Sequence, residues 1–289
     1  MVRPPITDPE LLERLGMDQE RFLEYLRSLL EGLPAREYEA KALVRAAEYP
    51  FDRPRGSFRL SAEEVTPLDE LGDVEREATI ARFAAAPDRH PLLAIGSNGS
   101  PQALLAKFAH FERAADREVL VLTGRLEDFD VGAAPQPALY GSMPATIFAS
   151  PGTRVRAALL WVTPAQFTQL AWSELSYSLG RLRTGFEVEL GESRFEEVYV
   201  FVSRFGAFSP EGRPVALAAV PAEGRSAATR TQEELLDAAA ALALGPGARA
   251  ADLVQAIHAE LAAVAPRIAT TVWPRATPFE SDLWQPFSP

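Results

Sequence analysis

The stretch PLLAIGSNGSPQALLAKF, residues 91–108, combines the signals of a buried strand, a tight polar loop and a helix. Residues 91–95 form a short apolar run bounded by turn residues, which is typical of a buried strand. Ser100 stands at an N-cap position, and Pro101 suits the first position of a helix. The loop at 96–99 therefore directs backbone N–H groups to one point beside the positive end of a helix, which suits a carboxylate or a phosphate. A simple tight turn built from Gly, Ser and Asn would use the same residues.

Composition limits what the chain can be. Its 289 residues, 47% of them hydrophobic, are enough for one large core or two domains. The net charge of −11 argues against nucleic acid or an anionic membrane as a partner, because both need clustered positive charge. The lack of cysteine excludes disulfides, thiolate catalysis and cysteine-ligated metals. His90, His110 and His258 lie far apart in the sequence and none pairs at metal-ligand spacing, so no metal site is expected.

No membrane or export signal is expected either. No apolar run approaches the roughly 20 residues that a membrane span requires. The first ten residues, MVRPPITDPE, lack the apolar segment of a secretory signal. We therefore expect a cytoplasmic protein with no membrane partner.

Residues 1–90 are predicted to form an N-terminal helical region. Helical spacing and capping residues predict helices in TDPELLERLG (7–16), MDQERFLEYLRSLLEGL (17–33), PAREYEAKALVRAAEY (34–49) and DVEREATIARFAAA (73–86). Residues 50–72 read as irregular. We expect no site chemistry in this region, since its acidic residues are typical of solvated helix faces.

Residues 91–225 are predicted to form the core, and residues 226–289 to pack on it. Apolar runs predict strands at 91–95, 119–122, 144–150, 153–163, 196–205 and 213–222, with a turn at Ser150-Pro151-Gly152. Helices are expected at 101–110 and 164–175. Because strands and helices do not alternate regularly, the pattern favours an α+β fold. The C-terminal part reads as a helix pair broken at Gly245-Pro246-Gly247, followed by an extended tail at 273–289.

A second candidate for site chemistry is the stretch WVTPAQFTQLAWSELSYSLGRL, residues 161–182. Thr163 and Gln166 form a capping box, and Phe167 begins an apolar helix face. Seven residues on, Glu174 stands where that face calls for a hydrophobic residue, and Tyr177 shares the face if the helix continues. Burial and the negative end of the helix both raise the pKa of such a carboxylate, which suits a general base.

Two non-catalytic roles for Glu174 are also compatible with its spacing. The carboxylate could pair with Arg181 or Arg183 as a structural ion pair. Alternatively, the helix could end early and leave Glu174 exposed. Spacing alone does not separate these two roles from a catalytic one.

The two stretches together resemble the γ-glutamylcyclotransferase-like family. GSN after the first strand is similar to that family's Tyr-Gly-Ser-Asn loop. YGSMPATIFASPGTRVRAALLWVTPAQFTQLAWSE (140–174) is similar to its next section, in which an Ala-Thr-rich strand leads through Ser-Pro-Gly to a strand with a Trp. A helix of the pattern Leu-Asp-x-x-Glu follows there, and its last residue is catalytic. That residue corresponds to Glu174, and the resemblance covers about residues 91–205.

The resemblance implies a small mixed β-barrel with helices around it, to which the N- and C-terminal helices are additions. It implies that Gly96, Ser97 and Asn98 hold a γ-glutamyl substrate through backbone N–H groups. It implies that Glu174 takes a proton from the substrate's α-ammonium, so that the amine attacks the γ-carbonyl. The products are 5-oxoproline and a free amine, with no metal or organic cofactor. Loop N–H groups would stabilise the oxyanion, and holding the bent substrate would provide much of the rate.

The sequence departs from the family pattern at two positions. Ile95 replaces the loop's leading Tyr, and Ala171 replaces the helix Asp. A Tyr side chain that touches substrate is lost at Ile95, and Tyr140 is the candidate to supply one from another place. The identity of the leaving amine stays open, as does whether the N-terminal helices form a homodimer interface or a lid over the barrel.

Two alternative functions remain. The first is a non-catalytic pocket of the same fold that binds a small anion or recognises a partner, which Ile95 and the added helices favour. The second is a serine hydrolase that uses Ser97 with His110 or His90. The sequence Gly96-Ser97-Asn98-Gly99 lacks the Gly-x-Ser-x-Gly spacing of a nucleophile elbow, which argues against the hydrolase.

Overall fold

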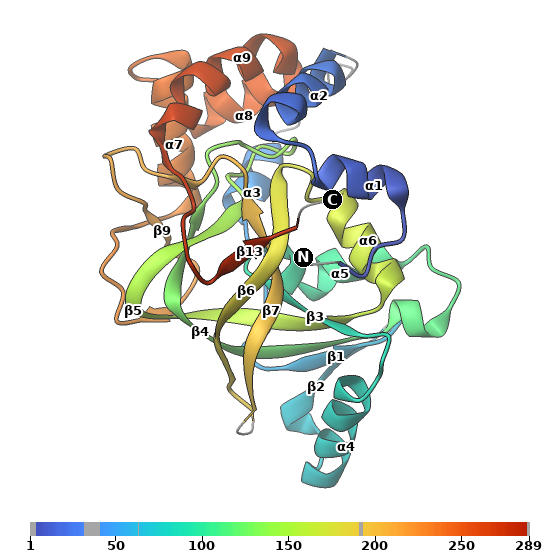
Figure 1. Ribbon diagram of the computed structural model, residues 1–289. Helices are drawn as coiled ribbons and strands as arrows, with labels where there is room; N and C mark the ends of the chain where they lie inside the picture. The colour runs from blue at the N-terminus through green and yellow to red at the C-terminus, as the bar shows by residue number, and fades with distance from the viewer. Residues whose placement is uncertain (1–3, 32–40, 63, 191–192, 288–289) are drawn as a thin grey trace.

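Five strands form a closed, mixed β-barrel at the centre of the computed structural model, which describes residues 4–31, 41–62, 64–190 and 193–287 (Figure 1). The order around the barrel is β5-β3-β7-β6-β4, and β4 pairs with β5 to close it. Only the β3–β7 pairing is parallel among these five. The barrel strands are β3 (His90–Ala94), β4 (Val119–Ala133), β5 (Ala145–Val162), β6 (Tyr177–Val188) and β7 (Arg194–Ser203). The predicted α+β fold with a small mixed barrel is confirmed.

Short strands extend the barrel at several edges. β1 pairs with β4 and with β2, β10 pairs with β5, and β9 pairs with β4 and β11. In the C-terminal tail, β13 lies on β6, and β12 pairs with β8. Their bounds are β1 (Phe58–Leu60), β2 (Val65–Pro67), β8 (Ala207–Phe208), β9 (Ala216–Leu217), β10 (Ala222–Glu223), β11 (Thr229–Arg230), β12 (Ala276–Thr277) and β13 (Trp284–Pro286).

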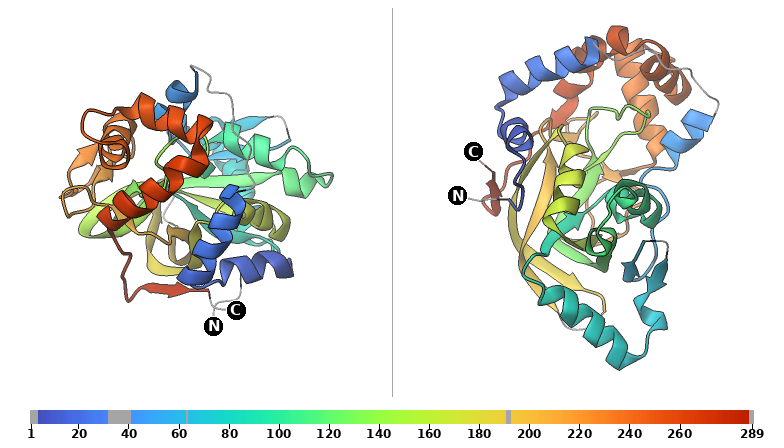
Figure 2. Two further views of the ribbon diagram at one scale, coloured as in Figure 1. Left: turned by 90° about the horizontal axis from the view of Figure 1, so that it is seen from above. Right: turned by 90° about the vertical axis from the view of Figure 1, so that its right-hand side faces the viewer.

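Helices cover the barrel on one side and at both ends. One group packs on the outer face of the sheet and buries it, consisting of α1 (Pro9–Leu15), α5 (Pro101–Phe108) and α6 (Pro164–Trp172). A second group caps one end of the barrel (Figures 1 and 2), consisting of α2 (Gln19–Glu31), α3 (Lys41–Ala47), α7 (Gln232–Leu244), α8 (Ala250–Ala259) and α9 (Leu261–Thr271). The remaining helix, α4 (Asp73–Ala84), lies at the opposite end.

Several sequence-based expectations in the core were wrong. The two strands expected around Ser150-Pro151-Gly152 are one strand, β5, because the extra residues form a bulge opposite Phe129 rather than a reversal of the chain. The helix expected to reach residue 175 ends at Trp172, and β6 begins only five residues later. At Gly180 of β6 the tail backbone comes so close that a Cβ would lie 2.4 Å from the Gln285 carbonyl oxygen, so a glycine is needed there.

Expectations for the two terminal regions also need correction. Residues 58–67, read as irregular, contain β1 and β2, which are held by pairing with β4 rather than by local pattern. The C-terminal helix pair is three helices, because the backbone bends at Glu260 and lets both α8 and α9 pack on α7. Residues 32–40 of the helices expected at 17–33 and 34–49 lie outside the described part of the chain.

Candidate functional site

Glu174 lies just beyond the end of α6, at the turn that leads into β6. The capping box of Thr163 and Gln166 starts the helix as expected, and Ser173 occupies the C-cap. The Glu174 N–H donates to the Ala171 carbonyl over 3.0 Å, and its own carbonyl accepts from the Tyr177 N–H over 2.9 Å. The helical face expected for Glu174 and Tyr177 is therefore wrong. A tight turn, rather than helical spacing, directs the partly buried Glu174 side chain.

A chain of hydrogen bonds connects Glu174 to a lysine through the 96–99 loop. Asn98 Nδ2 donates to Glu174 Oε1 over 3.0 Å. Lys107 Nζ donates to Asn98 Oδ1 over 2.7 Å and to Ser173 Oγ over 2.8 Å. Lys107 comes from the last turn of α5, so strand, loop and helix of the 91–108 stretch all serve this contact. The carboxylate thus has one neutral amide donor and a cation at one remove.

Burial is the largest influence on the pKa values of Glu174 and Lys107. It raises the pKa of Glu174, while the Lys107 charge and the Asn98 hydrogen bond act in the opposite direction. Burial likewise lowers the pKa of Lys107, against the pull of the Glu174 charge. The two arginines considered as partners of Glu174 are not bonded to it. Arg181 pairs with Glu197 over 2.8 Å, and Arg183 is exposed.

The 96–99 loop is a 3₁₀ turn whose first glycine is pressed against a tyrosine. The Gly99 N–H donates to the Gly96 carbonyl over 3.0 Å. A Cβ built on Gly96 would lie 2.1 Å from the Tyr49 hydroxyl oxygen, so only glycine fits. Ile95, at the position where the resemblance calls for a Tyr, is buried with the core and is 6% exposed. Ser100 stands at the N-cap of α5, but its side chain makes no capping hydrogen bond.

Tyr49, which follows α3 in the chain, supplies a hydroxyl at this loop. The Ala145 N–H donates to the Tyr49 hydroxyl oxygen over 2.8 Å, and the Ser97 backbone also bonds to it. Burial raises the pKa of Tyr49 well above its ordinary value, and these backbone bonds oppose the rise. A residue of the N-terminal region, where no site chemistry was expected, therefore contacts the loop. Long-range packing brings Tyr49 to the loop, and no local pattern marks it.

Tyr140 and Tyr177 complete a set of three tyrosines around the carboxylate. The Tyr177 hydroxyl donates to the Ala145 carbonyl over 2.9 Å, and the Tyr140 ring packs against Phe51. The Glu174 charge contributes to the raised pKa of Tyr49, Tyr140 and Tyr177 alike, so all three lie within its field. Tyr140 is thus near the carboxylate, whereas the hydroxyl that touches the loop belongs to Tyr49.

Sequence reasoning also missed Lys107. The chain has only two lysines, at positions 41 and 107, among 29 basic residues. Lysine is rare in this arginine-rich sequence, and Lys107 lies in the helix that follows the loop. This rarity was the signal that could have identified Lys107 as a candidate. Lysine reaches Asn98 and Ser173 as a compact charge with rotatable donors, a geometry that the planar arginine fork does not share.

The serine hydrolase alternative has no support from the geometry. His90 packs edge-on against the Tyr199 ring, and His110 packs against Phe111. Across the described ranges, no hydrogen bond joins Ser97 to either histidine. The described residues also contain no group of three His, Cys, Asp or Glu that could hold a metal ion. None of the described helices has the length and apolar character needed to cross a membrane.

Comparison with known proteins finds similarity in the fold alone. No protein-family model matches the chain, and no curated protein does. Solved structures that resemble it include a protein from Arabidopsis thaliana (15% identity, 42% of this chain and 72% of that one, TM-score 0.33). A second example is a gamma-glutamyl cyclotransferase (17% identity, 40% of this chain and 66% of that one, TM-score 0.30). A third is an uncharacterized protein from Homo sapiens (17% identity, 40% of this chain and 67% of that one, TM-score 0.29). These matches are partial and distant, so the roles proposed below are argued from the geometry of the site itself.

Proposed function

We propose that the Glu174 site converts a γ-glutamyl amine or peptide to 5-oxoproline and a free amine. The observation that carries this proposal is the state of the carboxylate. Glu174 is partly buried, bonded to a neutral amide and separated from the nearest cation by Asn98. Burial raises its pKa, and a carboxylate in that state is suited to accept and return a proton near neutral pH.

The proton balance of the reaction needs one such group. Glu174 accepts a proton from the α-ammonium of the substrate, and the freed amine attacks the γ-carbonyl carbon. The C–N bond to the leaving group then breaks, and the two protons lost by the α-nitrogen end on the leaving amine, with Glu174 as the carrier. Because the attack is intramolecular, holding the bent substrate provides a large part of the rate.

The loop and Tyr49 supply the polar contacts for the reacting carbonyl. Two backbone N–H groups, from Ser97 and Ala145, point at the Tyr49 oxygen. These bonds polarise the hydroxyl, so its own proton becomes a stronger donor to a developing oxyanion. In this proposal Tyr49 provides the hydroxyl that the Ile95 position cannot.

The direct test is release of 5-oxoproline by the full-length protein from a panel of γ-glutamyl dipeptides, glutathione and γ-glutamyl amines. Glu174→Gln keeps the shape of the side chain and removes the base, so we expect a loss of at least about 100-fold in rate. Glu189→Gln, which alters a carboxylate outside the site, controls for charge. Full activity of a folded Glu174→Gln protein would overturn the mechanism, and the ranking of substrates identifies the leaving group.

A second candidate is a non-catalytic pocket that binds a small anion or a partner. The observation that favours it is the Tyr49 hydroxyl, which already takes the Ala145 N–H that a substrate oxygen would use. This candidate predicts saturable binding of a γ-glutamyl compound with no turnover. No 5-oxoproline from any compound of the panel, together with such binding, would decide for it.

A further inference from the structure

A cavity of about 320 Å³ lies beside the 96–99 loop, with Gly99 in its wall. Its walls come from the segment after α3 and from the edge of β4 and β5, and they include Phe51, Arg53, Pro54, Gly99, Arg156 and Pro221. Neither Glu174 nor Asn98 lines it. The volume is within the range of roughly 300–1,000 Å³ that small-molecule pockets occupy.

Arg53 is the unusual residue of this cavity. Its Nη1 atom donates to the Ile95 carbonyl over a long 3.4 Å, and its side chain lies against Gly99. Within the described ranges, no carboxylate forms an ion pair with it. The side chain is partly buried, and burial lowers its pKa. Among the described residues, this guanidinium therefore has no carboxylate to offset its lost hydration.

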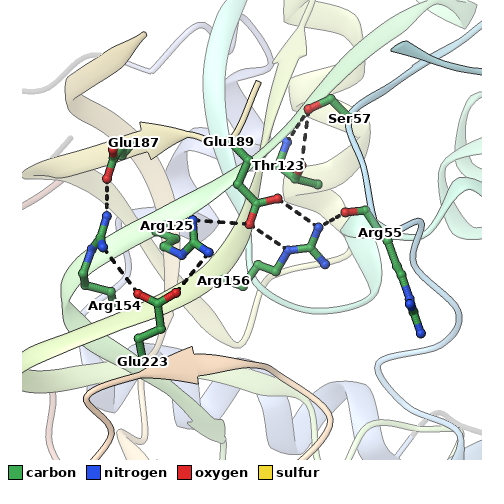
Figure 3. Close-up of polar contacts among 9 residues, drawn as sticks. All are labelled: Arg55, Ser57, Thr123, Arg125, Arg154, Arg156, Glu187, Glu189 and Glu223. Carbon is green, nitrogen blue, oxygen red and sulfur yellow. Dashed lines mark hydrogen bonds and ion pairs between the residues drawn. The ribbon is translucent and has the colours of Figure 1, made fainter. Parts of the chain in front are cut away.

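The neighbouring charges do not provide that partner. Arg156, close enough to oppose the Arg53 charge, is held by Glu189 over 3.1 Å from both Nε and Nη2 (Figure 3). The side chain of Arg55 leads away from Arg156, whose guanidinium bonds to the Arg55 carbonyl. Glu48 and Asp52 also line the cavity, but both are exposed to solvent. Arg53 is thus a cationic wall residue of the cavity that no carboxylate of the described residues neutralises.

We propose that this cavity binds a small organic anion, with a carboxylate or phosphate group on the Arg53 guanidinium and an apolar part against Phe51, Pro54 and Pro221. Arginine matches planar carboxylate and phosphate groups through two parallel hydrogen bonds. The proposal does not depend on the chemistry at Glu174. The two sites share one loop, however, since Arg53 lies on Gly99 and Tyr49, four residues earlier, lies on Gly96.

The experiment uses titration calorimetry of the full-length protein with phenylacetate, phenyl phosphate and the neutral isostere phenylacetamide. We expect saturable binding of at least one anion and none of phenylacetamide, and the tighter anion distinguishes a carboxylate from a phosphate site. Arg53→Met should weaken that binding at least about tenfold, because it removes a charge-assisted bond. Arg213→Met is the matched control, since it removes the same charge from an exposed position that does not line the cavity.

Arg53→Lys keeps the charge and provides a second test in case Arg53→Met does not fold. We expect it to stay folded by circular dichroism and to bind more weakly than the native protein, because lysine cannot form the paired bonds. Equal affinity in native, Arg53→Met and Arg53→Lys proteins would overturn the proposal. Equal loss in Arg53→Met and Arg213→Met, equal binding of phenylacetamide, or no binding of either anion would overturn it as well.

Discussion

Two glutamates, Glu189 and Glu174, illustrate two uses of the same side chain. Glu189 lies on the outer surface and contacts Arg125 and Arg156 directly, within a network of arginines and glutamates (Figure 3). Glu174 forms no ion pair with an arginine of the described ranges and accepts a hydrogen bond from the Asn98 amide. The cation near it, Lys107, is bonded to Asn98 and Ser173 instead.

The two carboxylates differ in the groups that contact them. Direct pairs with guanidinium groups stabilise a carboxylate in its charged form, and exposed pairs add little to stability. Burial raises the pKa of Glu174, and the Lys107 charge and the Asn98 hydrogen bond oppose this rise without cancelling it. The network of arginines and glutamates around Glu189 is therefore interpreted as structural. The hydrogen-bonded series Glu174–Asn98–Lys107 is the candidate for proton transfer.

We expect the largest effect from Asn98→Ala, because one change removes both the donor to Glu174 and the acceptor of Lys107. We expect the rate of 5-oxoproline release to fall by about 10- to 100-fold, since the base loses its fixed position. Ser97→Ala is the matched control, because the loop uses the Ser97 backbone rather than its side chain. It should keep the rate within about twofold. Equal rates for the two variants would contradict a positioning role for Asn98.

Gly96→Ala tests the contact between the loop and Tyr49. The added Cβ meets the Tyr49 hydroxyl at 2.1 Å, so we expect unfolding free energy to fall by about 2 kcal/mol in urea titrations. In the Tyr49→Phe background the hydroxyl is gone, and the same glycine change should cost clearly less. Gly56→Ala, whose Cβ has only an ordinary contact at 3.9 Å, should change stability by less than about 0.5 kcal/mol. Equal costs in both backgrounds would refute the contact.

Lys107→Met tests how the Lys107 charge affects the pKa of Glu174. The Lys107 charge lowers the pKa of Glu174 against the effect of burial, so removing it raises that pKa. The base is active when deprotonated, and the acid limb of the pH–rate profile should therefore move to higher pH. Lys41→Met, at the chain's other and exposed lysine, should leave the limb in place. A shift to lower pH would have the wrong sign for this account.

The smallest effect is expected in the outer network. Glu189→Gln removes one carboxylate from a solvated cluster, and we expect unfolding free energy to change by at most about 1 kcal/mol. Chemical denaturation in low and high salt measures it, because salt should reduce the difference. A loss well above that value, unaffected by salt, would show that the network is more than a surface cluster.

Local sequence patterns predicted the segments in which several candidate site residues lie. The strand, loop and helix at 91–108 were visible in the sequence, as was the capping box that starts α6. Glu174 was found because it interrupts an apolar period, although the helix ends two residues before it. A helix end depends on competing contacts in the tertiary structure, and spacing does not record them.

Residues that reach the site through long-range packing were not predictable in this way. Tyr49 is 96 residues from Ala145 along the chain, and no pattern links the two. Strand β6 was missed for a similar reason, because it is stabilised by pairing with β7 and by the tail on Gly180 rather than by alternation. Lys107 could have been identified from the rarity of lysine alone.

The most direct test of the account is the titration of the Glu174 carboxyl carbon by ¹³C NMR, with the signal assigned by its absence in Glu174→Gln. Release of 5-oxoproline reports the reaction, whereas this titration reports the property from which the reaction is inferred. We predict a midpoint above 4.5, the ordinary value for a glutamate, because burial outweighs Asn98 and Lys107. A midpoint at or below 4.5 would contradict the proposed role of Glu174 as a general base.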